Sequence, residues 1–198
     1  MGQRLVVTVK NNNEAICKIY YHWSAYTYSA LHETKKVIDC IYNSEDETIK
    51  DMLLRLIRFL EDNGGGIKGD ESEFKHIQKL YPKEKFRQDG YSRSNGLIAL
   101  SKEGMKDFQD WSEGDMIIDL DTDTVENTVF NWYDSLEEYN RERMEWDDEF
   151  EGYKLEDIKE INYDLGNFDV EDISNIICEL YNVEDVYRLG SAVFEMIA

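Results

Sequence analysis

The stretch LVVTVKNNNEAICKIYY, residues 5–21, decides the fold of this chain. Leu5 to Lys10 and Ala15 to Tyr21 are two runs rich in β-branched and aromatic residues, and Asn11 to Asn13 between them is a turn signal. Two such runs around a short asparagine turn are typical of a β-hairpin. We therefore expect the chain to open with two antiparallel strands that start a sheet.

Downstream of this hairpin, the apolar residues take a helical spacing. Ser44 followed by Glu47 has the form of a capping box, which predicts that Ser44 is the N-cap of a helix. From Ile49 to Leu60 the apolar side chains recur at a nearly ideal helical period, and Asn63 with the three glycines after it ends the helix. An earlier helix is predicted from apolar residues at similar spacing, which are Ala30, Leu31, Val37, Ile38 and Ile41.

Shorter elements are predicted from the rest of the first 133 residues. The polar segment 83–95 is expected to be an exposed loop. Further along the chain, Gly104 weakens the helical pattern of the residues that surround it. The other expected elements are a helix over Glu71–Tyr81, a strand over Gly96–Leu100, a helical turn over Lys102–Trp111, and a hairpin of Asp115–Asp121 and Thr124–Trp132.

Because these strand pairs are local and separated by helices, we expect an α+β fold. Its antiparallel sheet would be built from the two hairpins, with the helices packed against it. The pattern divides the chain after residue 133, so that residues 1–133 form the α+β core and residues 134–198 form an acidic, mostly helical region packed on that core. Helices are expected near Val170–Tyr181 and Glu184–Ile197.

Charge is distributed very unevenly along the chain. The formal net charge is −21, from 22 Lys+Arg against 43 Asp+Glu. Residues 1–110 carry 17 basic and 17 acidic side chains, whereas residues 111–198 carry 5 basic and 26 acidic ones. This asymmetry predicts that the C-terminal half meets a positively charged partner. It disfavours direct binding to nucleic acid or to an anionic membrane surface.

Composition narrows the class of protein further. With 41% hydrophobic and 13% aromatic residues, the chain is too apolar for a disordered acidic tail. Cys17, Cys40 and Cys178 form neither a CxxC pair nor a metal-ligand cluster, so we expect reduced thiols in a cytoplasmic protein. We also expect no signal peptide and no membrane span.

The segment Asp119 to Asp123 resembles the start of a calcium-binding loop. Thr124 and Phe130 occupy the positions that such a loop needs as Gly and Glu, so we expect a hairpin turn here instead. No other spacing in the chain indicates a ligand set or a cofactor motif. We therefore predict neither a metal site nor a cofactor.

A row of carboxylates is predicted on one face of a helix between Asp134 and Phe150, apart from an apolar stripe that includes Trp146. Like charges at this spacing repel one another, and the segment offers few basic residues to offset them. One interpretation is that the row stands in for the phosphates of a nucleic-acid strand and occupies a basic groove. The other is a solvated face that serves solubility. The acidic residues are Glu138, Glu142, Glu145, Asp148 and Glu149.

A second candidate site is the aromatic loop after the first hairpin, with His22, Trp23 and Tyr26. A nucleophile paired with His22 is conceivable, because Cys17 and Ser24 lie nearby in the sequence. However, no orienting acid has a diagnostic spacing, and such a loop is more often a packing element than a catalytic one. A small hydrolase with its site at this loop is the alternative function.

The N-terminus resembles that of a known group of proteins. The chain opens Met1-Gly2-Gln3-Arg4 and continues after the hairpin with Tyr21-His22-Trp23-Ser24-Ala25-Tyr26. Small, mostly uncharacterised phage and bacterial proteins begin Met-Gly-x-Arg and carry a similar Tyr-x-His/Gln-Trp-Asp-Gly-Tyr loop. The resemblance spans residues 1–45, with Ser24-Ala25 in place of the usual Asp-Gly. It implies a phage or mobile-element setting and transfers no activity.

Together, these patterns lead us to expect a non-enzymatic, phage-type inhibitor of a host defence nuclease, either a CRISPR or a restriction effector. It would act in the cytoplasm of the host cell. Its partner would be a basic protein surface that normally holds nucleic acid, and the acidic helix would mimic or occlude that nucleic acid. A third interpretation is an interaction domain whose acidic residues serve solubility alone.

Overall fold

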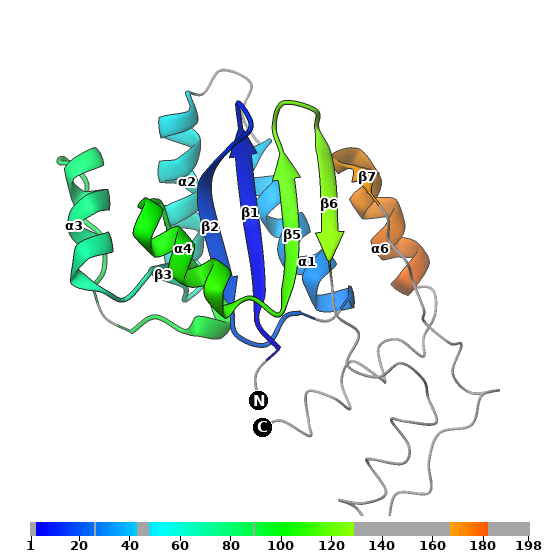
Figure 1. Cartoon of the computed structure of the whole chain (residues 1–198), viewed down its shortest axis with the longest axis horizontal. Helices are drawn as coiled ribbons and strands as arrows, with labels where there is room; N and C mark the ends of the chain where they lie inside the picture. Colours follow the sequence, from blue (N-terminus) through cyan, green and yellow to red (C-terminus); the bar gives the residue numbers. More distant parts are fainter. Residues whose placement is uncertain (1–2, 26, 43–47, 89, 129–166, 182–198) are drawn as a thin grey trace, which may run out of the picture.

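A computed structural model describes residues 3–25, 27–42, 48–88, 90–128 and 167–181 of the chain. These residues form a seven-stranded sheet with helices on both of its faces, as Figure 1 shows. The expected α+β class is therefore confirmed.

The opening hairpin is present as β1 (Leu5–Asn11) and β2 (Glu14–Tyr21), which pair antiparallel. Asn12 and Asn13 connect them and both take positive φ values, 52° and 60°. A two-residue hairpin turn needs this left-handed backbone at both positions, and asparagine tolerates it better than most residues. The asparagine run thus sets the turn and, through it, the strand register.

The sheet is mainly antiparallel, as expected, but it is mixed, because two of the six strand pairings in the described residues are parallel. Its strand order is β3-β4-β2-β1-β5-β6-β7. β1 pairs in parallel with β5, and β3 in parallel with β4. A helix over residues 71–80 lies between β3 and β4, whereas three strands and several helices of the described chain lie between β1 and β5. A parallel pair needs such a long connection, because the chain must return to the end where the first strand began. The further strands are β3 (Gly66–Ile67), β4 (Leu97–Ala99), β5 (Gly114–Asp119), β6 (Thr124–Thr128) and β7 (Phe168–Asp169).

The helices expected in the described ranges are also present. The second predicted hairpin is confirmed as β5 and β6, while residues 129–132 lie outside the described part of the chain. The short strand β3 was not predicted. The helices are α1 (Thr27–Ile41), α2 (Ile49–Asp62), α3 (Glu71–Leu80), α4 (Lys102–Trp111) and α6 (Ile173–Tyr181), with 3-10 turns η1 (Arg93–Asn95) and η2 (Val170–Asp172).

The start of α2 differs from the prediction. Its N-cap is Thr48, whose side-chain oxygen accepts a hydrogen bond from the backbone N–H of Asp51 at 3.2 Å. The predicted cap, Ser44, lies four residues earlier and outside the described residues. Serine and threonine both serve as N-caps, so the sequence offers two candidates, and the apolar period beginning at Ile49 suits the later one.

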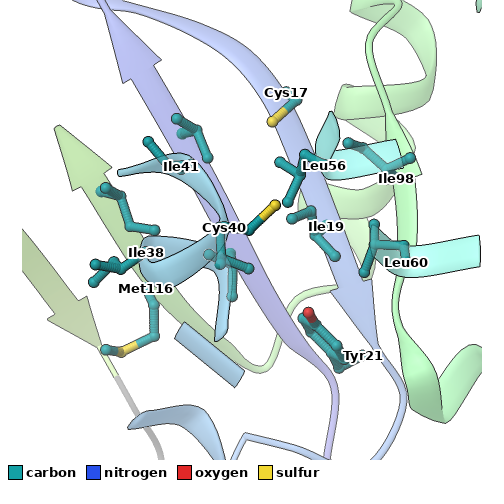
Figure 2. Packing of buried hydrophobic residues seen from close by; sticks show 14 of the residues in the cluster. Cys17, Ile19, Tyr21, Ile38, Cys40, Ile41, Leu56, Leu60, Ile98 and Met116 are labelled. Carbon is teal, nitrogen blue, oxygen red and sulfur yellow. The ribbon is translucent and has the colours of Figure 1, made fainter. Parts of the chain in front are cut away.

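The two faces of the sheet carry different cores. On one face, α1 and α2 pack on the alternate residues of β1 and β2 that point toward them, and α6 packs against α1 nearer the β7 edge. Figure 2 shows Cys17, Ile19 and Tyr21 of β2 in this cluster with Leu56 and Leu60 of α2. On the other face, α4 covers a smaller cluster, which consists of Val6, Tyr20, Leu97, Ala99 and Phe108.

Part of the C-terminal region belongs to this same structure. β7 pairs with β6 at the edge of the sheet, and Ile173 and Ile177 of α6 are buried in the larger core. The rest of the region predicted as acidic and helical, including residues 134–166, lies outside the described residues. The division after residue 133 therefore stays a prediction.

Candidate functional site

Carboxylates gather at the end of the sheet where β5 turns into β6; Asp119 is half-buried and the others are exposed. β5 ends at Asp119, the turn carries Asp121 and Asp123, and β7 and η2 lie alongside. The backbone N–H of Val170 donates to the carbonyl oxygen of Asp123 at 2.9 Å, which joins the two segments. We call this surface the acidic end; it consists of Asp119, Asp121, Asp123, Asp169, Glu171 and Asp172.

Hydrogen bonds fix the β5–β6 turn within the acidic end. The backbone N–H of Asp121 donates to Asp119 Oδ1 at 2.9 Å, and the backbone N–H of Asn13 donates to Asp121 Oδ2 at 3.0 Å. The Tyr42 hydroxyl donates to Asp123 Oδ1 at 2.6 Å. Burial and this hydrogen bond raise the pKa of Tyr42 well above its ordinary value. The calcium-like motif is thus a hairpin turn, as its sequence predicted.

The electrostatics of the acidic end are one-sided. Residues 111–128 and 167–181 contain ten Asp and Glu residues and no Lys or Arg. Among the described residues, no lysine or arginine forms an ion pair with the six carboxylates of the acidic end. Lys10, on the neighbouring strand β1, is paired with Asp119 in the sheet. The surface is therefore strongly negative and preorganised.

The row of glutamates predicted as the main partner surface lies outside the described residues. This applies to Glu138, Glu142, Glu145, Asp148 and Glu149. The acidic end was not singled out from the sequence, although its charges belong to the same acidic half. The sequence could have predicted this surface, because the two expected strands carry acidic residues on both sides of the turn with no lysine between them.

The aromatic loop lies at the opposite end of the sheet, where β2 ends and β5 begins (Figure 1). The Tyr20 hydroxyl oxygen lies 2.7 Å from Nδ1 of His22, a hydrogen bond. The His22 ring meets Trp23 edge-to-face at 4.7 Å between ring centroids, and Tyr20 meets Trp111 in the same way at 5.7 Å. Four rings thus form a chain of contacts from Trp111 at the end of α4 to Trp23, the second residue after β2.

Two arginines flank His22. The backbone N–H of His22 donates to the carbonyl oxygen of Arg93 at 3.0 Å. Arg4 forms a salt bridge with Glu113, with Nη2 2.9 Å from Oε1. Partial burial, together with the positive charges of Arg93 and Arg4, lowers the pKa of His22 below its ordinary value, so the ring is neutral at neutral pH. We call Arg4, Tyr20, His22, Trp23 and Arg93 the aromatic end.

The structure does not bring Cys17, one of the two proposed nucleophiles, to His22. Cys17 points into the larger core on one face of β2, whereas Tyr20, the partner of His22, points to the other face. Burial raises the pKa of Cys17 to about 12, which keeps it as a thiol. Ser24 is buried, and Tyr26 lies outside the described residues. Arg93 and Glu113 were not predicted as neighbours, because strand pairing brings them there from far along the chain.

Comparisons with protein-family models, with characterised proteins and with solved structures find no match to this chain. In the described ranges, no group of three or more His, Cys, Asp or Glu side chains is arranged to hold a metal ion. None of the helices in those ranges has the length and apolar character that a membrane crossing requires.

Proposed function

We propose that this chain is a binding protein that occupies a basic, nucleic-acid-binding surface of another protein and blocks it. The observation that carries this proposal is the acidic end, a surface of six carboxylates without ion-pair partners among the described residues, of which the three in the β5–β6 turn are held by hydrogen bonds. A neutral solvated surface would normally interleave both signs of charge. Here the two segments that form the surface contain no Lys or Arg at all.

Physical chemistry favours a basic partner for such a surface. A row of fixed carboxylates displaces counterions from a basic groove in the same way as phosphates do. Long-range attraction between a −21 protein and a basic surface also accelerates association, and salt screens that attraction beyond about 8 Å at physiological ionic strength. Binding of this kind is therefore fast and sensitive to salt.

The narrower proposal is a phage-type inhibitor of a host defence nuclease, a CRISPR or restriction effector, acting in the cytoplasm of the host. The support for this setting is the N-terminal resemblance to phage and bacterial proteins over residues 1–45. The glutamate row of residues 138–149 would extend the acidic surface and so enlarge the area that mimics nucleic acid.

The alternative is a small hydrolase with its site at the aromatic end. The observation in its favour is the hydrogen bond between Tyr20 and His22, which orients the imidazole. Against it, Cys17 faces the larger core and Ser24 is buried. A well-folded His22→Ala variant that loses all biological effect would favour the hydrolase over the inhibitor.

A plating assay tests the inhibitor directly. The chain is expressed in bacteria that carry a restriction or CRISPR system and in matched bacteria without one, and both are challenged with a phage that the system targets. We expect the chain to raise plating efficiency in the defended host alone. The variant with all six carboxylates of the acidic end changed to Asn or Gln should lose this effect. Equal protection by the variant, or none by the wild type against any system, would reject the proposal.

A further inference from the structure

The aromatic end contains polar groups that the fold does not use. Among the described residues, the guanidinium of Arg93 has no ion-pair or hydrogen-bond partner, although its own backbone carbonyl holds His22. The Nε atom of Arg4 is buried and likewise has no hydrogen-bond partner. With Tyr20 at Nδ1, the ring nitrogen of His22 left for another partner is Nε2. Arg93 is exposed and available to a ligand, whereas the Nε atom of Arg4 is buried, and a buried polar atom without a partner indicates a missing ligand or water.

We propose that the aromatic end binds a small planar anion of the nucleoside monophosphate class, with its ring against Trp23 and its anionic group at Arg93 and His22 Nε2. This site is separate from the acidic end and does not depend on the function proposed for that surface.

The charges at the aromatic end favour an anion. Among the described residues, the positive charges of Arg93 and Arg4 lower the pKa of His22, and the carboxylate that raises it, Glu113, forms an ion pair with Arg4. Arg93 is exposed, so its guanidinium is free to take a phosphate or carboxylate in the two-pronged geometry that this group prefers. A protein that is strongly negative overall thus has a local cationic site.

The rings favour a planar ligand of small size. Trp23 is half-buried and lies beside His22, so a ligand bound at His22 has an indole within reach for stacking. A long nucleic-acid strand would carry many phosphates past the −21 charge of the protein and be repelled, whereas a mononucleotide adds few charges. The site therefore fits a single nucleotide better than a strand.

The test is a titration with adenosine monophosphate followed by NMR of the histidine ring signals of the full chain. The chain has three histidines, so His32 and His76 are internal controls. We expect the ligand to shift the His22 signals alone and to raise the pKa of His22, because a bound anion offsets Arg93 and Arg4. Unchanged His22 signals, or equal shifts at all three rings, would overturn the proposal.

Variants and other ligands sharpen this test. Arg93→Gln should weaken adenosine monophosphate binding at least about tenfold, as expected for loss of a charge-assisted hydrogen bond, whereas Lys102→Gln, which removes an equal exposed charge, should not. Adenosine and inorganic phosphate should each bind more weakly than the nucleotide. Phosphate binding as tightly as the nucleotide would contradict the role of Trp23, and a six-nucleotide DNA strand binding more tightly would contradict a small ligand.

Discussion

Gly65 occupies a position where even one added carbon atom has no room. A Cβ there would lie 2.2 Å from the carbonyl oxygen of Gly96 and 2.5 Å from that of Asn95, and both are backbone atoms that cannot rotate away. The close approach joins the end of α2 to the turn before β4. The glycine run therefore serves packing at this position as well as ending the helix.

We expect Gly65→Ala to lower the free energy of unfolding by at least about 1–3 kcal/mol, the usual cost of overpacking. The matched control is Gly69→Ala, because a Cβ at Gly69 has no atom within 4 Å, and its effect should stay within about 0.5 kcal/mol. Urea unfolding of the wild type and the two variants measures both changes in the free energy of unfolding. Similar midpoints for the two variants would show that the contact at Gly65 is absent.

Cys17 is a buried thiol whose pKa burial raises to about 12. The thiolate is the reactive form, so we expect the folded protein to leave Cys17 unmodified by iodoacetamide at about pH 8, near the pKa of a free thiol. In urea the same residue should react fully. Peptide mass spectrometry reads both states, and rapid modification of Cys17 in the folded protein would contradict its burial and reopen a nucleophilic role.

Helix α2 shows how a local signal predicts an element but misplaces its first residue. The apolar period predicted the helix, and Asn63 with the glycines after it predicted its end, whereas Ser44 and Thr48 were both candidates for the N-cap. We expect Thr48→Ala to cost about 1 kcal/mol, the usual contribution of a cap, and Ser44→Ala to cost clearly less. Urea unfolding of both variants decides between the two caps, and the reverse order would place the start of α2 at Ser44.

Glu73 joins α3 to the start of α4. Its buried carboxylate accepts hydrogen bonds from the backbone N–H groups of Leu100 at 2.7 Å and Ser101 at 3.0 Å, and also from the Ser101 hydroxyl. The space beside it explains Gly104, since a Cβ there would lie 2.3 Å from Glu73 Oε2. The residue that weakened the helical pattern of α4 is thus the one that allows α4 to pack.

We expect Glu73→Ala to destabilise the protein by at least about 1–3 kcal/mol, because it leaves buried backbone donors without an acceptor. The control is Glu71→Ala, two residues away on the same helix, which removes an exposed carboxylate whose ion pair with Lys75 contributes little. Thermal melts should separate the two variants by several degrees. Equal melting temperatures would show that the Glu73 contacts do not stabilise the fold.

Helices and hairpins could be predicted where their sequence patterns span a few consecutive residues, whereas the pairing of distant strands in the sheet could not. The asparagine turn of the first hairpin and the apolar period of α2 are each contained in a few consecutive residues. The parallel pairing of β1 with β5 brings Arg4 against Glu113, 109 positions away, and no local pattern reports it. For the same reason, His22 and Trp23 were recognisable as candidates, while Arg93 and Glu113 beside them were not.

At the scale of the whole molecule, the two ends of the sheet differ in charge. The acidic half of the chain supplies the exposed carboxylates at one end, and the neutral half supplies Arg4 and Arg93 at the other. The sequence predicted the uneven charge, and the positive charge of the partner stays a prediction. It did not predict that the turn between β5 and β6, next to β7, forms a negative surface, because that placement depends on the sheet.

The most direct test of the acidic end is capture from a bacterial lysate by the wild type and by the variant with its six carboxylates changed to Asn or Gln, in parallel. We predict that the wild type retains a nucleic-acid-binding protein at about 50 mM salt and releases it at about 200 mM salt. Added duplex DNA should also displace it, and the variant should not retain it. Retention of the same protein by both chains, with equal dependence on salt and DNA, would contradict the account.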